Sequence, residues 1–567
     1  MTDAIASSKI RKWERLEGDR GVFKAHWQDT ANYMLPDRND YMVERPPGAK
    51  RMTYIYDSTP VMALEQFAAG MHSLLTSTSL QWFFMRTEEN RLDQMDAVRI
   101  WLEIVSDVMY RIFNGPKHNF ASQSHELYLD EGSIGTACMA VLESPRSGIL
   151  FSTRHMKECV IGENDEDRID VNYRKWRWTA QQAVEKWGVE ALKRGGCDKV
   201  LKAWAEGGDG GDGGKKFMFL HAVEPRLKRN PSRRDRRHKP FESVFVCVDD
   251  KATIDVGGFD EFPYMIPRLS KVTGERYGRG PGMLVLPDTK MLNEMAKTVL
   301  KSAQKIVDPP LQVPDSGFLM QIKTVPGAFN YYRANTSARI EPIETNGNIP
   351  IGIELINALR QQIIRGMYVD WMIMPSDPRD PAASGKGITA TYVLQQRDEK
   401  MRMMAPMLAR LQSEFLGPLI DRVFGILWRK SEAMGFGPGS PFPRPPQILE
   451  GVPLRVEYVS PIAIAQKSSQ MDGVTRLLQL QSEIRQLDPQ GILVIDPEAV
   501  MRIAQRDWNA PAGTLKSPER LQQETQSRAE AEQAMARVNQ IESAAGAAKD
   551  GTAAIKNLRD PSNARAA

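Results

Sequence analysis

Two stretches of the sequence place a lysine directly after a glycine, as in the loops that bind nucleotide phosphates. Such a loop needs a glycine, four further residues, and then Gly-Lys followed by a hydroxyl residue. Gly214-Lys215 and Gly385-Lys386 both lack the first glycine and the hydroxyl residue, and those places hold Asp209, Lys216, Asp380 and Gly387. A third stretch, Gly278-Arg279-Gly280, lacks the last glycine of a dinucleotide-binding fingerprint. We therefore predict no nucleotide site.

Metal ligands and nucleophiles are scattered along the chain. The seven histidines show no HExxH pattern and no Cys/His spacing that suits zinc. The four cysteines, Cys138, Cys159, Cys197 and Cys247, lie far apart without a CxxC pair, which is typical of reduced thiols in the cytoplasm. No Gly-x-Ser-x-Gly elbow marks a serine nucleophile. We predict no catalytic residue, no metal and no cofactor, and hence a protein that is not an enzyme.

Cationic side chains gather in two places. Lys290, Lys297, Lys301 and Lys305 recur on one face of a predicted helix. Such a face is usually only solvated, but repeated around a ring it would form stacked cationic belts. The loop Arg226–Lys239 (RLKRNPSRRDRRHK) joins two predicted strands. It could touch phosphates, or it could be a solvated hairpin or a subunit-interface loop.

Composition limits how strongly the chain can bind nucleic acid. The 567 residues are enough for several cores, and 41% hydrophobic with 26% charged residues is ordinary for a folded protein. Lys and Arg number 75 against 71 acidic residues, a net charge of only +4. Any contact with nucleic acid should therefore be local or weak. No apolar run is long enough to span a membrane, and the N-terminus does not have the pattern of a signal peptide.

The predicted elements alternate between helical and β-rich parts. Thr59 and Pro60 are expected to begin a helix that continues to about Leu75, with Thr59 as its cap. Further helices are expected at about 10–34, 92–113 and 121–131, and a helical patch at Trp176–Trp204. Short strands are predicted at Ala137–Glu143, Phe217–Val223 and Val244–Asp249.

Two helices of similar length bracket a small β module. They are predicted at about Asp288–Val307, with a stripe of Leu292, Met295, Val299, Ala303 and Ile306, and at about Gly352–Ile373, with a stripe of Ile356, Leu359, Ile363 and Met367. Leu311–Pro350 between them is strand-and-turn in character. A long helical run, about Thr389–Gly435, should kink or divide at Pro406 and Gly417-Pro418. Helices are also expected at Gln466–Gln486, at Pro497–Trp508 and from about Ser517.

Several stretches, in this order and spacing, resemble the portal (head-to-tail connector) proteins of short-tailed bacteriophages. They are Tyr56-Asp57-Ser58-Thr59 with Ala63 to Ser73, Tyr277-Gly278-Arg279-Gly280-Pro281 leading into Leu286-Pro287-Asp288 and Leu292-Asn293-Glu294, Ala303-Gln304-Lys305 before Asp308-Pro309-Pro310, Gly327-Ala328 with Asn330-Tyr331-Tyr332, Ala390-Thr391 through Arg397-Asp398-Glu399-Lys400 to Gly417-Pro418-Leu419-Ile420-Asp421-Arg422, and Glu457-Tyr458-Val459-Ser460-Pro461. The similarity covers roughly Trp13 to Trp508.

The resemblance implies an α+β, mainly helical portal fold with wing, stem, clip and crown regions. About twelve copies would assemble into a ring around a central channel. The implied regions are the wing 1–287, the first stem helix 288–308, the clip 309–350, the second stem helix 351–373, the channel loop 374–388, the long wing helix and its return 389–465, the crown helices 466–545 and a disordered tail 546–567.

The resemblance also implies partners and candidate contact residues. The ring would stand at one capsid vertex of the virion, after assembly in the bacterial cytoplasm, and pass double-stranded DNA without sequence preference during packaging and ejection. Its partners would be the terminase large subunit, tail adaptor and nozzle proteins, and the major capsid and scaffolding proteins. The candidates are Asp377, Arg379, Asp380, Ser384 and Lys386 in the channel loop, Lys297, Lys301 and Lys305 on the stem, and Asp315, Lys323, Tyr331, Tyr332 and Arg333 in the clip.

Two other classes of protein stay open at this level. One is a different virion structural protein, either capsid or scaffold, which would assemble into shells or rods and not into closed rings. The other is a packaging enzyme such as the motor ATPase or a nuclease. That enzyme would need a phosphate loop or a carboxylate cluster for metal, and the sequence offers neither pattern.

Overall fold

The computed structural model describes residues 3–46, 48–93, 95–207, 214–233, 235–312, 341–342, 349–372, 402–449, 451–458, 526–527 and 535. The chain divides into two compact units. The first comprises residues 1–83, 107–443 and 458–462, and the second comprises 84–106, 444–457 and 463–567. Helices and strands both contribute, which confirms a mixed α and β protein.

Helices open the first unit. They are α1 (Ala4–Asp19), α2 (Gly21–Met34), the short η1 (Pro36–Arg38) and α3 (Thr59–Leu75). The single helix predicted from Ile10 to Met34 is wrong, because the chain breaks at Arg20. Glycine is a poor helix former, and Gly18 and Gly21 flank the break. The Arg20 guanidinium is buried and donates to main-chain oxygens of residues 156, 157 and 159, which holds the break in place.

The start of α3 differs in detail from the prediction. Pro60 stands in the first turn as expected, where its missing amide costs no hydrogen bond. Thr59 was predicted to be the capping side chain, but it is already helical. Asp57 takes that role instead, since its Oδ1 accepts the Thr59 amide at 2.9 Å.

Two longer helices follow. α5 (Asp96–Asn114) and α6 (Phe120–Ile134) confirm the helices predicted at about 92–113 and 121–131, and α4 (Asn90–Asp93) is a short turn before them. In the second unit, β1 (Phe83–Thr87) pairs with β12 (Leu454–Tyr458). An ion pair between Arg86 Nε and Glu457 Oε2, at 3.1 Å, joins the two strands.

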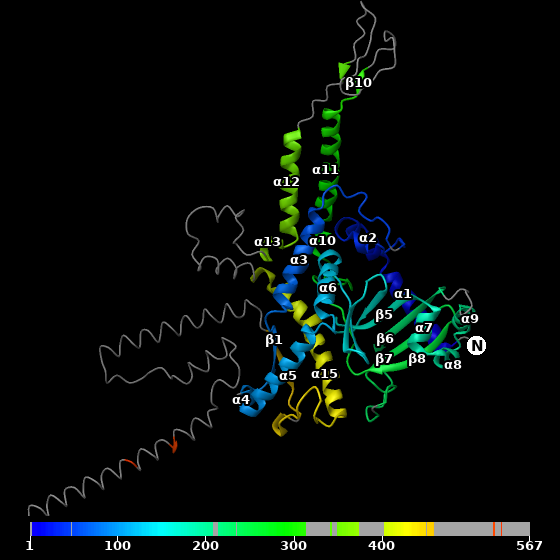
Figure 1. Ribbon diagram of the computed structural model, residues 1–567, viewed down its shortest axis with the longest axis vertical. Coiled ribbons are helices and arrows are strands. Elements are labelled where there is room, and N and C mark those ends of the chain that lie inside the picture. The colour runs from blue at the N-terminus through cyan, green and yellow to red at the C-terminus, as the bar shows by residue number, and fades with distance from the viewer. Residues whose placement is uncertain are drawn as a thin grey trace, which may run out of the picture. The chain divides into compact units, whose positions relative to one another are not determined.

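Two antiparallel sheets form the β-rich part of the first unit (Figure 1). The smaller sheet has the order β3-β2-β9, from β2 (Met139–Ser144), β3 (Gly148–Thr153) and β9 (Tyr264–Met265). The larger sheet runs in sequence order through β4 (Cys159–Glu163), β5 (Ile169–Thr179), β6 (Lys216–Pro225), β7 (Phe241–Cys247) and β8 (Ala252–Phe259). The three predicted strands are confirmed as parts of β2, β6 and β7.

Each face of the larger sheet has its own core. Side chains alternate along a strand, so Phe217 and Phe219 of β6 lie in one cluster with α7 (Ala180–Trp187), α8 (Val189–Gly195) and α9 (Asp198–Gly207). Leu220 and Ala222 lie in another cluster, with Ala6 and Leu16 of α1. The helical patch was predicted to begin at Trp176, but Trp176 belongs to β5. The helix begins at Ala180, because Thr179 and Gln182 form a capping box.

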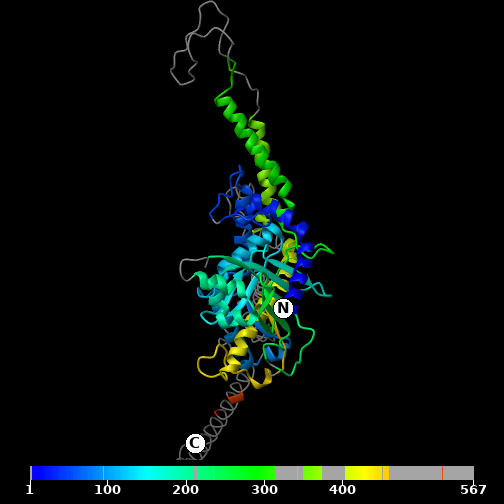
Figure 2. The ribbon, with the colours of Figure 1, turned by 90° about the vertical axis from the view of Figure 1, so that its right-hand side faces the viewer.

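The paired helices are confirmed and lie side by side in both ribbon views (Figures 1 and 2). After α10 (Pro281–Leu284), α11 (Leu286–Val307) runs to β10 (Leu311–Gln312), and α12 (Ile349–Gly366) returns from β11 (Glu341–Pro342). The predicted second helix is too long. It ends at Gly366, Tyr368 adopts the left-handed region at φ 59°, and α13 (Val369–Met372) is a separate turn.

The long helical run divides just before Gly417-Pro418, as predicted, but the division or kink predicted at Pro406 is wrong as a division, because Pro406 lies inside the uninterrupted helix 402–411. Residues 389–401 of the run lie outside the described residues. Residues 402–411 are α-helical, Gln412–Leu416 (η2) form a π-helical turn, and α15 (Gly417–Ala433) continues. The Gly417 amide donates to the oxygen of Gln412, five residues back. η3 (Gln447–Leu449) follows before β12. The helices predicted at 466–486 and 497–508 and the tail 546–567 lie outside the described residues.

Candidate functional site

The candidate site is the antiparallel pair of α11 and α12. Leu292 of α11 and Ile356, Leu359 and Ile363 of α12 are buried, as the predicted stripes require. The ladder Leu311–Pro342 and Gln312–Glu341 joins the chain where it leaves α11 and where it returns to α12. Ile306, predicted to extend the stripe, is 45% exposed. Gly352 lies opposite Val299 and α12 begins at Ile349, so the last turn of α11 reaches past the end of α12.

Two glycines let the helices approach closely. A Cβ at Gly352 would lie 2.8 Å from Cγ2 of Val299, and a Cβ at Gly366 would lie 2.3 Å from Cγ1 of Val285. Real Cβ atoms do not approach other carbons this closely, so both positions favour glycine. They stand near the two ends of α12.

The lysine row of α11 divides into two halves. Lys290 pairs with Asp29 at 2.9 Å, and Lys297 lies 3.4 Å from Glu294 with its ammonium 5.7 Å from the Tyr56 ring centre. Lys301 and Lys305 are exposed and have no ion-pair partner in the part of the chain that the structure describes. The outer half of α11 therefore carries positive charge that no described carboxylate neutralises.

The inner ends of the pair are bound to the segment before α3. Asp57 Oδ2 accepts two hydrogen bonds from Arg360 of α12, at 3.0 and 2.9 Å. Burial alone would raise the pKa of Asp57, but hydrogen bonds from Thr59 and Arg360 outweigh burial, and the pKa lies below its ordinary value. Asn293 of α11 accepts from the Tyr56 amide and donates to the Tyr54 oxygen, at 2.8 and 3.1 Å. These hydrogen bonds fix how α11 and α12 are attached to the segment before α3.

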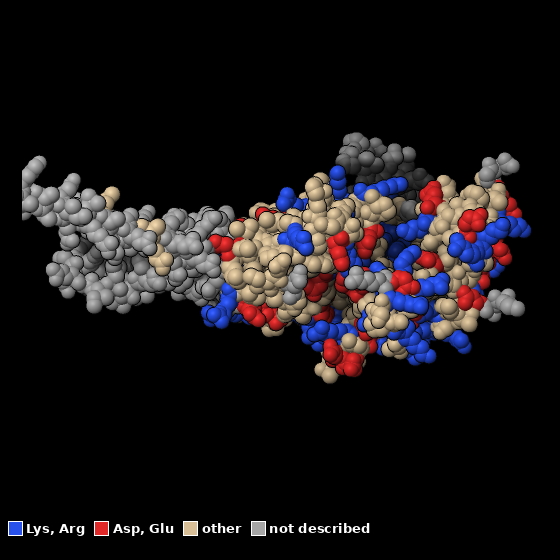
Figure 3. Space-filling model, turned by 90° about the horizontal axis from the view of Figure 1, so that it is seen from below, with Lys and Arg blue, Asp and Glu red and all other residues tan. Residues whose placement is uncertain are grey.

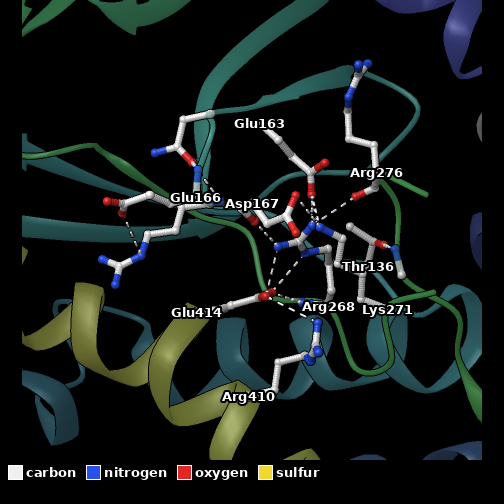
Figure 4. A network of polar contacts seen from close by, with 12 residues as sticks. Thr136, Glu163, Glu166, Asp167, Arg268, Lys271, Arg276, Arg410 and Glu414 are labelled. Carbon is white, nitrogen blue, oxygen red and sulfur yellow. Dashed lines mark hydrogen bonds and ion pairs between the residues drawn. The ribbon is translucent and has the colours of Figure 1, made fainter. Parts of the chain in front are cut away.

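A buried arginine connects the π-helical turn to the strands (Figure 4). Arg268, 1% exposed, donates to Glu414 of η2 through its amide, Nε and Nη2 at 3.0, 3.0 and 2.9 Å. Its Nη1 also pairs with Glu163 at the end of β4, and its Nη2 donates to the Asp167 oxygen at 2.8 Å. Lys271 adds a second cation, 2.9 Å from Glu163. One guanidinium thus joins η2, β4 and the segment after β9.

Glu131 of α6 is a fully buried carboxyl. Neither of its oxygens has a hydrogen-bond partner among the residues that the structure describes. Burial, and then the nearby charges of Glu414 and Asp130, raise the pKa of Glu131 well above its usual value. Burial therefore favours the protonated, neutral form of this carboxyl.

The Gly278-Arg279-Gly280 stretch packs against the end of α6. A Cβ at Gly278 would lie 2.4 Å from the Gly135 oxygen, and one at Gly280 would lie 2.6 Å from the Glu131 oxygen. Close backbone packing explains these glycines without any bound phosphate.

The buried thiols form two pairs. All four cysteines are unbridged and buried, and Cys138 Sγ lies 3.8 Å from Cys159 Sγ. Cys197, Cys247 and Asp250 have potential ligand atoms within 4.8 Å of one another. Cys247 Sγ lies 3.7 Å from Asp250 Oδ2, a thiol–carboxylate hydrogen bond that satisfies both groups. Only spatial proximity reveals this cluster, since its two cysteines are far apart in sequence.

Of the predicted contact residues, only the stem lysines are described. Lys297 is partly engaged, and Lys301 and Lys305 project from α11. The channel-loop candidates Asp377, Arg379, Asp380, Ser384 and Lys386 lie outside the described residues. So do the clip candidates Asp315, Lys323, Tyr331, Tyr332 and Arg333.

The pair of α11 and α12 has a cationic outer half and is carried on a β-rich body, and the sequence contains no nucleotide-binding loop. These features indicate a structural connector. The chain belongs to the family of bacteriophage head to tail connecting proteins, whose pattern it matches over residues 6–515.

Two related proteins are named as portal proteins. A probable portal protein of Bordetella phage BPP-1 is 31% identical over 485 residues, covering 83% of this chain and 81% of the relative. The portal protein of Salmonella phage epsilon15 is 27% identical over 553 residues, covering 94% of each.

These comparisons confirm the resemblance predicted from the sequence and the function of a portal protein. Members of this family are structural proteins at the head–tail junction of the virion, with capsid and tail partners. Among the described residues, every helix is too short or too polar to cross a membrane.

Proposed function

We propose that about twelve copies of the chain form a closed ring at one capsid vertex. The ring conducts double-stranded DNA inward during packaging and outward during ejection. α11 and α12 are the stem that lines the channel, residues 309–350 are the clip, 1–287 and 389–465 build the wing, 374–388 form the channel loop and 466–545 the crown.

The observation that carries this proposal is the exposed outer half of the α11 lysine face, where Lys301 and Lys305 have no ion-pair partner among the described residues. Lys301 and Lys305 of every copy would form two cationic belts around the channel. A conduit must let DNA slide, so its contacts should be mobile and blind to sequence. Exposed lysines on a helix supply contacts of this kind, and the net charge of only +4 keeps the binding of DNA by the chain as a whole weak.

The partners follow from the same arrangement. The terminase large subunit would dock on the clip during packaging and supply ATP hydrolysis. Tail adaptor and nozzle proteins would then occupy that surface, while capsid and scaffolding proteins would contact the wing. Assembly would take place in the host cytoplasm. The clip residues Asp315, Lys323, Tyr331, Tyr332 and Arg333 and the channel-loop residues Asp377, Arg379, Asp380, Ser384 and Lys386 are the proposed contacts.

Negative-stain imaging of the purified full chain tests the assembly. We expect closed rings with a central hole wide enough for a duplex. Shells or rods would favour a capsid or scaffold protein, and a compact monomer at all concentrations would overturn the proposal. An ATPase measurement on the same preparation should stay at background, whereas turnover would favour a packaging enzyme.

A further inference from the structure

The loop 226–239 between β6 and β7 is held against β8 by three of its cations. Arg226 Nη2 donates to the Gly257 oxygen at 2.8 Å, Arg236 Nη2 lies 3.3 Å from Asp255 Oδ2, and Lys239 Nζ lies 2.8 Å from Asp260 Oδ2. The Arg226 amide also donates to the Pro240 oxygen at 2.7 Å, which closes the base of the loop. The loop is therefore anchored at its two ends.

Four further cations among the described residues of the loop project into solvent. Lys228, Arg229, Arg233 and Arg237 are exposed, and none has an ion-pair partner within the described residues. Asp235 is the loop's own carboxylate, and it is engaged by His238, whose Nδ1 lies 2.5 Å from Asp235 Oδ1. The loop thus has three cations that anchor it to β8 and four that face outward.

The chemistry of this surface favours phosphates over a folded protein partner. Protein interfaces depend on aromatic or apolar anchors that fill pockets. The loop contains no aromatic residue, and its one large apolar side chain, Leu227, is 95% exposed and isolated. Closely spaced arginines match phosphate oxygens through their planar fork. Figure 3 shows Lys and Arg side chains dense over the part that carries the β4–β8 sheet, with acidic side chains among them.

We propose that Lys228, Arg229, Arg233 and Arg237 form a docking surface for the backbone of double-stranded DNA, separate from the α11 lysines. Binding would be independent of sequence, because the loop offers cations without side chains suited to base edges. The proposal does not depend on the channel, since the loop belongs to the β-rich part and not to the helix pair.

A covalently closed DNA minicircle separates the two surfaces, because it cannot be threaded through a preformed ring. Its affinity for the full chain would be measured by microscale thermophoresis at several KCl concentrations. For K228A/R229A/R233A/R237A we expect at least about tenfold weaker binding near 0.1 M salt. The slope of log affinity against log salt should fall by about 3.6, since each of the four phosphate contacts contributes about 0.9.

The matched control removes four exposed cations from the helices beside the same sheet. K186A/K193A/R194A/K202A has the same net charge as the loop variant, and all four positions are exposed. We expect its affinity and slope to equal those of the unaltered chain. If both variants lose the same affinity for the minicircle, the effect is one of overall charge and the proposal is overturned. An unchanged salt dependence of the affinity in the loop variant would overturn it as well.

A polyglutamate peptide tests the competing partner class. If the unaltered chain binds this peptide more tightly than the minicircle, and the loop variant loses that binding, the loop recognises an acidic protein and the proposal is overturned. Equal thermal midpoints and equal masses by light scattering will show that both variants fold and assemble alike. Ring formation and packaging are read out separately, so failure here leaves the conduit proposal untouched.

Discussion

Arg268 is a buried cation whose carboxylate partners, Glu414 and Glu163, come from two distant parts of the first unit. Replacing it by alanine would remove the buried guanidinium that Glu414 and Glu163 share, leaving Glu163 with Lys271 and Glu414 with the more distant Arg410, at 3.6 Å. Breaking one side of a buried pair costs about 3–5 kcal/mol. We expect Arg268→Ala to lower the free energy of unfolding by about that amount, measured by urea denaturation monitored by tryptophan fluorescence.

A surface pair provides the comparison. Arg279 and Glu275 are separated by 2.5 Å, with side chains 45% and 27% exposed. Such pairs contribute about 0–1 kcal/mol, so Arg279→Ala should have a small effect. Arg268→Lys should recover part of the loss, because it restores the charge but not the fork that contacts Glu414. Equal effects at both arginines would contradict the assigned role of Arg268.

Glu131 predicts a pH dependence of the opposite sign to that of ordinary carboxylates. Its pKa is raised in the folded protein by burial, so the folded state retains a proton that the unfolded state releases. Its contribution to stability is complete below the unfolded pKa and is lost as pH rises toward the folded value. The slope is at most about 1.4 kcal/mol per pH unit.

Glu131→Gln should remove this slope, since the amide does not titrate. We expect the variant to gain stability relative to the unaltered chain between pH 5 and pH 8, and the difference to level off near pH 4. Chemical denaturation across this range measures the difference. Parallel stability curves over the whole range would show that Glu131 does not titrate differently in the folded state.

The roles of individual residues could be predicted only in part from the sequence. The lysine row of α11 follows from spacing alone, and the absence of a phosphate loop follows from missing glycines. Arg268, Glu414 and Glu131 could not be singled out, because their environment is assembled from segments more than a hundred residues apart. The one local signal was Gly417-Pro418, which marks the π-helical turn that carries Glu414.

At the scale of elements, the close contact of α11 and α12 depends on Gly366. Its alanine substitution would place a Cβ 2.3 Å from Cγ1 of Val285. Overpacking of this kind costs about 1–3 kcal/mol, which outweighs the gain in helix propensity. We expect Gly366→Ala to lower the thermal midpoint of the full chain, measured by calorimetry.

Val285→Ala supplies the second half of a double-mutant cycle. It removes the methyl groups that the new Cβ would strike, so Gly366→Ala should cost less in the Val285→Ala background than in the unaltered chain. Gly352→Ala, with a milder contact of 2.8 Å to Val299, should have a smaller effect. Additive costs at Gly366 and Val285 would contradict a direct clash.

Helix stripes and strand alternation were predictable because they depend on residues close in sequence. Both helices of the pair, α6 and three strands were found within a few residues. The errors fall where local pattern and tertiary contact disagree. The break at Arg20 depends on a guanidinium buried under β4, and the end of α12 depends on Tyr368 adopting a left-handed backbone.

At the scale of the whole molecule, substitution of Lys301 and Lys305 tests the proposed passage of DNA through the ring. K301E/K305E should assemble normally, since neither lysine has a described partner. Reversing both charges in about twelve copies would repel DNA phosphates along the channel, and we expect at least about tenfold fewer DNase-protected genomes per particle. K186E/K193E, on exposed positions of α7 and α8, is the control. Normal packaging by K301E/K305E would remove the lysines from the mechanism.

The family was recognisable from the sequence only as a resemblance spread over most of the chain. No composition or period indicates the proposed ring, because surfaces that would join copies are ordinary surfaces in a single chain. The order of many short stretches carries that information, and each stretch alone has a local structural reason, such as the close packing of Gly278 and Gly280 on α6.

The β10–β11 ladder has an evolutionary consequence. The chain departs from α11 and returns to α12 at paired residues, Leu311 with Pro342 and Gln312 with Glu341. Because these pairs hold both attachment points in register, the sequence between them can change without altering how the chain leaves α11 and returns to α12. If residues 309–350 dock the tail and motor proteins, as we propose, a lineage could exchange those partners by recombining this segment.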